Sequence, residues 1–199
     1  LFDSPNYAKL FPVGDAGRLF TDTAEVRAMM LVEGTLAILQ GKAGTIPEIS
    51  AQAIHRASLE LQIDPAGLSD ATGQNGVSVP GLVAEFRKLM QAPEHAQYLH
   101  FGATSQDITD TALMLRLRQL LGLQESALKS MIAHLRKLAT DHAETPMVAR
   151  TYGQSATLTS FGATVASWGH PFIDLLDEME NLRASTLWVS LAGAAGTAS

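Results

Sequence analysis

The sequence contains no cysteine among its 199 residues. That absence excludes a disulfide framework, a thiol nucleophile and any metal site built on thiolates, and nothing indicates an oxidising compartment. We therefore expect a cytoplasmic protein. We also expect no metal, because five of the six histidines are scattered without the spacing of metal ligands: His55, His95, His134, His142 and His170.

Basic residues are also scarce. Lys and Arg number 14 against 20 Asp and Glu, which gives a formal net charge of -6, and no basic cluster interrupts this balance. We therefore expect neither nucleic acid nor an anionic membrane surface as a partner. Hydrophobic residues make up 46% of the chain and charged residues 17%, a balance typical of a folded protein rich in close-packed helices.

A long, purely apolar run is missing as well. Residues 151–173 carry no Asp, Glu, Lys or Arg and would be numerous enough to span a bilayer. Their many Ser and Thr residues, with Gln154 and His170, remove the transfer energy that insertion requires. We predict a helix buried among other helices and no membrane partner. No signal peptide is evident, and the ends, Leu1 and LAGAAGTAS, lead us to expect a fragment.

Apolar spacing predicts helices along most of the chain. Asp22, with Glu25 at capping-box spacing, begins a mostly buried helix that ends near residue 43. Pro47 opens an amphipathic helix, and Asp64-Pro65 has the pattern of an N-cap followed by Pro at the first helical position. We expect a loop over residues 71–81, a helix over residues 81–91 and a further turn from Pro93.

Two long helices are predicted, over residues 105–142 and 155–187, the second with a kink at Pro171 and preceded by an extended or loop segment. Helices of this length are typical of large bundles or obligate oligomers. The fold class is therefore all-α, with an N-terminal helical domain over residues 1–100 and the first part of a long-helix bundle over residues 101–199. A stripe of small residues predicts subunit assembly through the second helix: Ala156, Ser160, Ala163 and Ser167.

The stretch HFGATSQD places a small, hydroxyl-rich loop directly before the first long helix. Two interpretations stay open. The free N–H groups of a helix N-terminus, next to Gly102, form a ready anion site. Alternatively Thr104 caps the helix and Asp107 closes a capping box, which needs no ligand. His100, just before the turn, donates either to a ligand or to a backbone carbonyl.

Two further polar stretches are candidates. QNGVS brings Asn75 and Ser78 into a loop between helices, although an ordinary surface turn fits equally. ARTYGQ places four polar side chains before a buried helix, where an Arg binds a ligand carboxylate or forms an ordinary ion pair: Arg150, Thr151, Tyr152 and Gln154. Glu33, on an otherwise apolar helix, is expected to pair with a buried Arg.

These motifs together resemble a known superfamily. HFGATSQDITDT is similar to the first signature region of the fumarase/aspartase superfamily, ARTYGQSATLTSFG is similar to the second, and RLFTDTAEVRAMMLVEGTLAILQGKAG resembles the N-terminal helix. The resemblance implies a long-helix bundle, a homotetramer whose active sites combine regions of different subunits, and no cofactor. The third signature, of GSSxMPxK type, has no match here, so we expect a polypeptide limited to these residues to lack activity.

Within the superfamily the chain most resembles the cycloisomerases, which act on a small tricarboxylate diene. The resemblance implies that Thr104 and Ser105 hold the carboxylate on which charge builds, while His100, Gly102 and Gln154 bind or orient substrate. Arg150 and Thr151 are expected to shape the second loop or to contact another carboxylate, with Asn75 and Ser78 as further binding residues.

Tyr152 separates this expectation from its main alternative. The fumarate-forming lyases that act on adenylosuccinate and argininosuccinate carry histidine in a similar RTHGQ run. A phenol titrates near pH ~10 and an imidazole near pH ~6.5, so Tyr152 is not equivalent to that histidine in proton transfer. A lyase remains the enzymic alternative. A non-catalytic helical oligomerisation domain is the alternative of another class.

Overall fold

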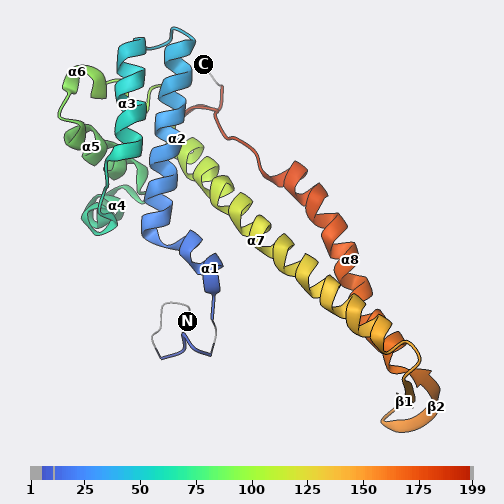
Figure 1. Ribbon diagram of the computed structural model, residues 1–199. Coiled ribbons are helices and arrows are strands. Elements are labelled where there is room, and N and C mark those ends of the chain that lie inside the picture. The colour runs from blue at the N-terminus through green and yellow to red at the C-terminus, as the bar shows by residue number, and fades with distance from the viewer. Residues whose placement is uncertain (1–5, 11, 198–199) are drawn as a thin grey trace. The chain divides into compact units, whose positions relative to one another are not determined.

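The computed structural model describes residues 6–10 and 12–197 and divides the chain into two compact units (Figure 1). The first unit comprises Leu1–Gln119 with Leu187–Ser199, and the second comprises Leu120–Thr186. Each unit is described by itself. The expected division at residue 100, into an N-terminal helical domain and the first part of a long-helix bundle, stays a prediction.

The first unit holds the short helices and the start of the long one. Its elements are α1 (Gly14–Gly17), η1 (Arg18–Phe20), α2 (Asp22–Lys42), α3 (Glu48–Glu60), η2 (Pro65–Leu68), α4 (Ser69–Asn75), α5 (Val79–Met90), α6 (Pro93–Ala96) and the first residues of α7 (Ser105–Asp141). The all-α class is confirmed, since the described strands form one two-stranded sheet. None of the described helices combines the length and the apolarity needed to cross a membrane.

Helices α2 and α3 pack side by side because small residues let their backbones approach (Figure 1). A Cβ at Gly34 would lie 2.0 Å from the Ser58 hydroxyl, and one at Gly41 would lie 2.4 Å from the Ala51 Cβ. Met29, Met30, Ile54, Leu82 and Phe86 are completely buried around this contact and form the core of the unit. The expected burial of the first long apolar helix is therefore confirmed.

Several expected boundaries shift. The N-cap of α2 is Thr21, whose hydroxyl accepts from the Ala24 amide at 3.2 Å, so the capping pattern begins one residue before Asp22. The Asp64-Pro65 cap is confirmed, because the Asp64 carboxylate accepts from the Ala66 amide at 3.0 Å. The loop expected over residues 71–81 is confirmed only for residues 76–78, because α5 already begins at Val79. Helix α4 continues to Asn75 and ends at Gly76, which adopts a left-handed conformation.

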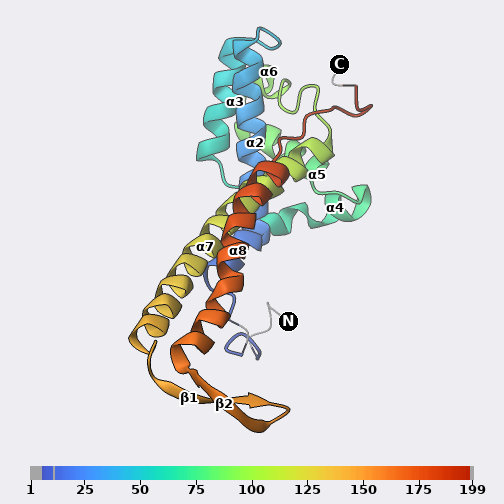
Figure 2. The same ribbon diagram turned by 90° about the vertical axis from the view of Figure 1, so that its right-hand side faces the viewer.

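The second unit consists of the end of α7, an antiparallel hairpin and α8 (Phe161–Thr186) (Figure 2). The hairpin strands are β1 (Pro146–Thr151) and β2 (Gln154–Ser160). The expected helical start near Ser155 was wrong: the segment rich in Thr and Ser is a strand, as suits β-branched side chains on an exposed ribbon. Ala156 and Ser160 therefore belong to β2, and the predicted helical stripe of small residues does not form.

Few side chains are buried in the second unit. Leu121, Val165 and Met179 are its buried apolar residues among those described, while Trp168 and Leu158 are exposed. Arg183 on α8 bonds Glu125 on α7 at 2.7 Å, and Lys129 bonds the same carboxyl at 2.6 Å. The hydrogen bond and charge of Lys129, followed by Arg183, hold the pKa of Glu125 below its ordinary value. Polar links therefore supplement a thin apolar contact.

Candidate active site

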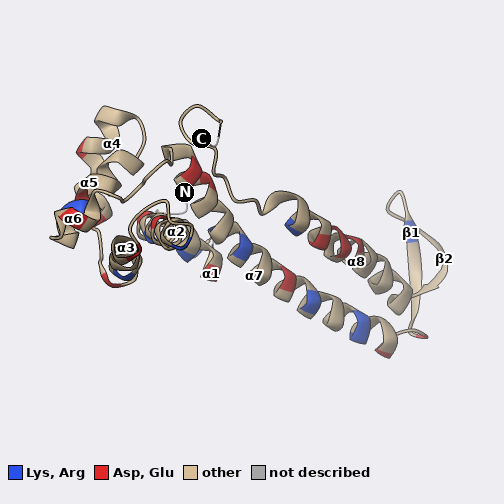
Figure 3. Cartoon of the chain, turned by 90° about the horizontal axis from the view of Figure 1, so that it is seen from above, with Lys and Arg blue, Asp and Glu red and all other residues tan. Residues whose placement is uncertain are grey.

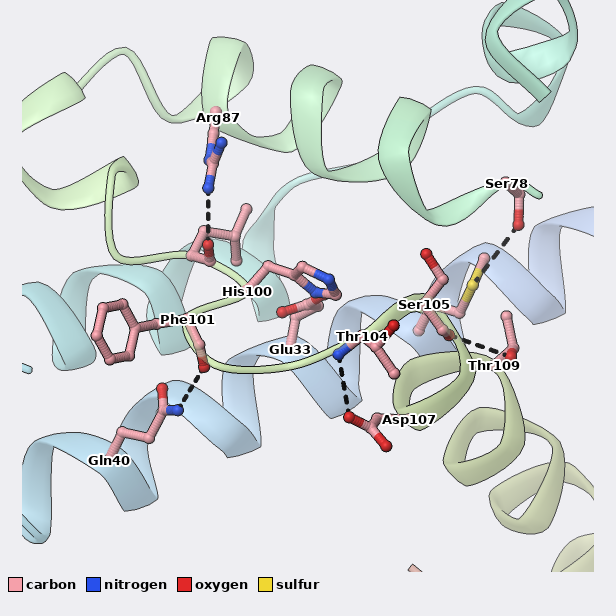
Figure 4. Close-up of polar contacts among 12 residues, drawn as sticks. Glu33, Gln40, Ser78, Arg87, His100, Phe101, Thr104, Ser105, Asp107 and Thr109 are labelled. Carbon is pink, nitrogen blue, oxygen red and sulfur yellow. Dashed lines mark hydrogen bonds and ion pairs between the residues drawn. The ribbon is translucent and has the colours of Figure 1, made fainter. Parts of the chain in front are cut away.

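The polar loop before α7 is fixed from two neighbouring helices (Figure 4). Arg87 on α5 donates to the Leu99 carbonyl at 2.9 Å, and Gln40 on α2 donates to the Phe101 carbonyl at 2.7 Å. Between these anchors His100 has φ 63°, a left-handed conformation that is uncommon for a side chain with a Cβ. Gly102, at φ 69°, completes the turn into the helix. The loop is therefore built to hold its side chains in one arrangement.

His100 is bonded to Glu33, not to a backbone carbonyl. Its Nδ1 lies 2.6 Å from Glu33 Oε1, and the Glu33 side chain is completely buried. The expectation that Glu33 pairs with a buried Arg was wrong. A single sequence marks Glu33 as a buried acid in need of a partner, but it does not reveal which of the distant basic groups meets it.

The contacts of Asp107 show that the start of α7 is capped. Its carboxylate accepts from the Thr104 amide at 3.0 Å, which is one half of the expected capping box. The same carboxylate accepts from the Ala192 and Gly193 amides at 2.8 and 3.0 Å, and from the Ser190 hydroxyl at 3.3 Å. Asp107 therefore joins the start of α7 to the segment that follows α8, a role that the sequence did not indicate.

These contacts lower the pKa of the Asp107 carboxyl. Burial of its carboxylate raises the pKa, but the hydrogen bonds from the Ala192, Thr104 and Gly193 amides and from Ser190 together outweigh burial. The pKa of Asp107 therefore lies below its ordinary value, and the side chain carries negative charge at the helix N-terminus. The hydrogen bonds of Asp107 are therefore complete without a ligand.

The hydroxyls beside it are different. Within residues 6–10 and 12–197, neither the Thr104 nor the Ser105 hydroxyl hydrogen-bonds another residue, and both side chains are only partly buried. Ser105 is the first residue of α7, and its carbonyl accepts from Thr109 one turn later at 3.1 Å. Two hydroxyl donors therefore remain available at a helix N-terminus. The motif is a cap through Asp107 and a candidate binding site through Thr104 and Ser105.

A cavity of about 540 Å³ opens one turn along α7 from Ser105, with Thr109 in its wall. Ser78, the residue before α5, lines it too and donates to the Met29 sulfur at 3.9 Å. Asn75 does not line this cavity, and its amide donates to the Ala71 carbonyl of its own helix at 2.7 Å. Asp22 and Glu25 are the charged residues of the wall, so the wall of this cavity supplies no cation for an anionic ligand.

The residues of the second motif lie in the second unit, at the tip of the hairpin. Tyr152 and Gly153 have φ 50° and 75°, as in a two-residue hairpin turn, and Thr151 pairs with Gln154 across it. Tyr152 has a relative exposure of 104%, and Arg150 and Gln154 are exposed as well. Arg150 is the one charged residue of the hairpin (Figure 3). The tip is thus free to contact another molecule.

The long helices, the hydroxyl-bearing helix start and the exposed hairpin tip define a class of all-α proteins with a polar site at the start of a long helix. A family model described as Lyase matches residues 18–199. The chain belongs to this family, within the fumarase/aspartase superfamily.

Individual relatives carry two kinds of names. The chain is 37% identical over 179 residues to a nitrosuccinate lyase of Streptomyces davaonensis, covering 89% of this chain and 38% of that protein. It is 33% identical over 195 residues to a 3-carboxy-cis,cis-muconate cycloisomerase of Acinetobacter baylyi, covering 96% of this chain and 43% of the relative.

A solved structure agrees with the second name. The crystal structure of the cycloisomerase from Acinetobacter calcoaceticus matches at a TM-score of 0.93 and 32% identity, over 97% of this chain and 46% of that one. The chain spans less than half the length of these relatives.

Proposed function

We propose that the protein to which this chain belongs is a cofactor-independent cycloisomerase that converts 3-carboxy-cis,cis-muconate to a carboxymuconolactone. This reaction is a step of protocatechuate breakdown, in the β-ketoadipate pathway of aromatic degradation. The observation that carries the proposal is the pair of unbonded hydroxyls, Thr104 and Ser105, at the N-terminus of α7, in a chain so similar to cycloisomerases. A cytoplasmic location accords with the absence of cysteine.

The chemistry needs donors aimed at growing negative charge. One carboxylate of the substrate adds to a carbon–carbon double bond, and electrons move onto a neighbouring carboxylate before the adjacent carbon is protonated. Thr104, Ser105 and the first amides of α7 hold that carboxylate, and the positive end of the helix dipole favours the charge. His100, two residues before Gly102 in the same loop, orients the substrate. Ser78 lines the neighbouring cavity and binds a more distant part of the substrate.

The hairpin contributes the remaining groups. Arg150 supplies the positive charge that the cavity of the first unit lacks, and it binds a second carboxylate together with Thr151 and Gln154. Tyr152, at the exposed tip, contacts the substrate through its phenol ring. Members of the superfamily are oligomers, and we propose a homotetramer in which the hairpin of one subunit completes the site of another. Asn75 has no place in this proposal, because its side chain is bonded to its own helix.

The direct test is turnover by the full-length protein. Incubation with 3-carboxy-cis,cis-muconate should remove the diene absorbance and yield a lactone without any added metal or cofactor. An absence of turnover under conditions in which a cycloisomerase relative is active would refute the proposal.

A second candidate, a lyase acting on nitrosuccinate, is favoured by the 37% identity over 179 residues. Elimination from that substrate would again place charge on a carboxylate next to the reacting carbon, so the same hydroxyls would serve. The products would be nitrite and a butenedioate. Nitrite release from nitrosuccinate, with no turnover of the muconate diene, would favour this candidate. Activity on adenylosuccinate or argininosuccinate would instead indicate a lyase of that type, which Tyr152 disfavours.

A further inference from the structure

Glu33 is a buried acid that the proposed chemistry does not use. It lies in the middle of α2, next to the buried Gly34 and one turn from Met29 and Met30, and its side chain has no exposed surface. Removing a carboxylate from water without a compensating partner is strongly unfavourable, because the charged group loses its hydration. A group of this kind persists in a core only where it has a specific partner.

The partner is the His100 ring, and the loop is shaped to present it. The carbonyls on both sides of His100, those of Leu99 and Phe101, are held by Arg87 and Gln40. His100, between them, adopts φ 63°, a left-handed backbone conformation that is unfavourable for a residue with a Cβ. In Figure 4 the ring lies against Glu33 and extends toward the side of the loop on which Thr104 and Ser105 lie. The strain therefore serves the orientation of the imidazole.

The contact also decides which ring nitrogen is free. An ionised carboxylate only accepts hydrogen bonds, so Nδ1, 2.6 Å from Glu33 Oε1, carries the proton of the neutral ring. Nε2 then carries the lone pair of the neutral ring. A histidine without such a partner would exchange between the two tautomers.

One atom of the pair remains unsatisfied. Glu33 Oε2 is buried and has no hydrogen-bond partner among the described residues. Buried polar atoms without a partner are uncommon, and a purely structural pair would be expected to satisfy both oxygens. The carboxylate is retained in spite of this cost, which points to its effect on His100 rather than to a contribution to stability.

We propose that Glu33 is a positioning residue, which fixes the His100 ring with Nδ1 protonated and Nε2 directed to the substrate. The catalytic part of this inference rests on the proposed function. The tautomer part does not, and it can be measured without any substrate.

The first experiment is solid-state ¹⁵N NMR of the full-length protein labelled at histidine, with the His100 signal identified by its loss in His100→Gln. The wild type should show Nδ1 protonated and Nε2 unprotonated when the ring is neutral. Glu33→Gln should populate the opposite tautomer, because the amide can rotate and donate to Nδ1. Glu60→Gln, which removes an exposed carboxylate on α3, is the matched control and should change nothing. A wild-type ring protonated only on Nε2 would overturn the inference, even if Glu33→Gln fails to fold.

The second experiment is a double-mutant cycle on kcat, with whichever substrate the full-length protein turns over. Glu33→Gln should lower kcat by about 10- to 100-fold with little change in KM, the size of effect seen when a partner of a functional histidine is removed. The same substitution in a His100→Gln background should lower it less than about 3-fold further, since both act through one group. Equal losses in both backgrounds would contradict a positioning role. If the wild type is inactive on every substrate, the proposed function fails while the NMR result still decides the tautomer.

Discussion

At the scale of single residues, the first signature motif separates into two roles that its letters do not distinguish. The Asp107 carboxylate accepts hydrogen bonds from backbone amides, while the hydroxyls of Thr104 and Ser105 have no partner among the described residues. A cap and a candidate binding site therefore coexist on one helical turn, and substitutions should separate them.

Ser105→Ala tests the binding role. Because its hydroxyl makes no hydrogen bond within the described chain, we expect little change in the free energy of unfolding. Loss of a donor aimed at developing charge should lower kcat by about 100-fold or more. Ser126→Ala, which removes a hydroxyl bonded to the Gly122 carbonyl farther along α7, is the control and should leave kcat unchanged. Loss of stability with an unaltered rate would mean that Ser105 is only a cap.

Asp107→Asn tests the structural role through pH. The pKa of Asp107 is lower in the folded chain than in the unfolded one, so the stabilising effect is complete above pH ~4 and is lost as the pH falls through the folded value. At neutral pH the variant should be less stable by about 2–4 kcal/mol, because several donors lose a charged acceptor.

Urea unfolding of both proteins, followed by circular dichroism between neutral and strongly acid pH, measures this difference. It should shrink below pH ~4, where the wild type loses the charge as well. Asp110→Asn is the control. The Asp110 carboxylate accepts a hydrogen bond from the Gln106 side chain on the same helix, and its replacement should show no such convergence. A difference that does not depend on pH would contradict the assignment.

At the scale of elements, the second unit depends on close contact between the start of α8 and the end of α7. A Cβ at Gly162 would lie 2.4 Å from the Ala139 carbonyl oxygen and 2.7 Å from that of His142, and backbone atoms have little freedom to move aside. We expect Gly162→Ala to destabilise the protein by about 1–3 kcal/mol in thermal or urea unfolding.

Gly169→Ala on the same helix is the matched control. A Cβ there would meet Leu135 at 3.7 Å, an ordinary contact, and replacing a helical glycine by alanine gains up to about 1 kcal/mol. The two substitutions should therefore change stability in opposite directions. The same sign for both would show that the α7–α8 contact is looser than described.

The second strand of the hairpin is the element that the sequence pattern did not predict, whereas β1 lies in the segment expected to be extended or a loop. Residues 154–160 lack charge and join directly to a helix, so their composition alone fitted a buried helical start. The strand forms because Pro146 begins an extended segment and the Tyr152-Gly153 turn folds it back against residues with β-branched side chains. Pairing between segments decides such cases, since seven uncharged residues are too few to show a period that distinguishes strand from helix.

At the scale of the whole molecule, the two candidate motifs lie in different units, and the second unit buries few apolar side chains by itself. Exposed Leu123, Met131 and Leu175 on its helices suit burial in an oligomer. The proposed shared site predicts complementation. Ser105→Ala and Tyr152→Ala should each be nearly inactive alone in the full-length protein.

Co-expression of these two variants should restore a measurable fraction of the activity, since a mixed oligomer contains some sites with both residues intact. Two variants of the same motif, Ser105→Ala and Thr104→Ala, form the control pair and should not complement each other. Absence of recovery in mixed oligomers, verified by mass, would exclude sites shared in this way.

The sequence by itself determined the helical class, the burial of α2, the extent of α7 and the family, because all of these depend on local periodicity and on motifs read in order. Tertiary structure alone decided that Glu33 meets His100, that Asp107 binds the segment after α8 and that residues 154–160 pair as a strand. These contacts join residues far apart along the chain. Each depends on the path of the backbone between its partners, which no local pattern encodes.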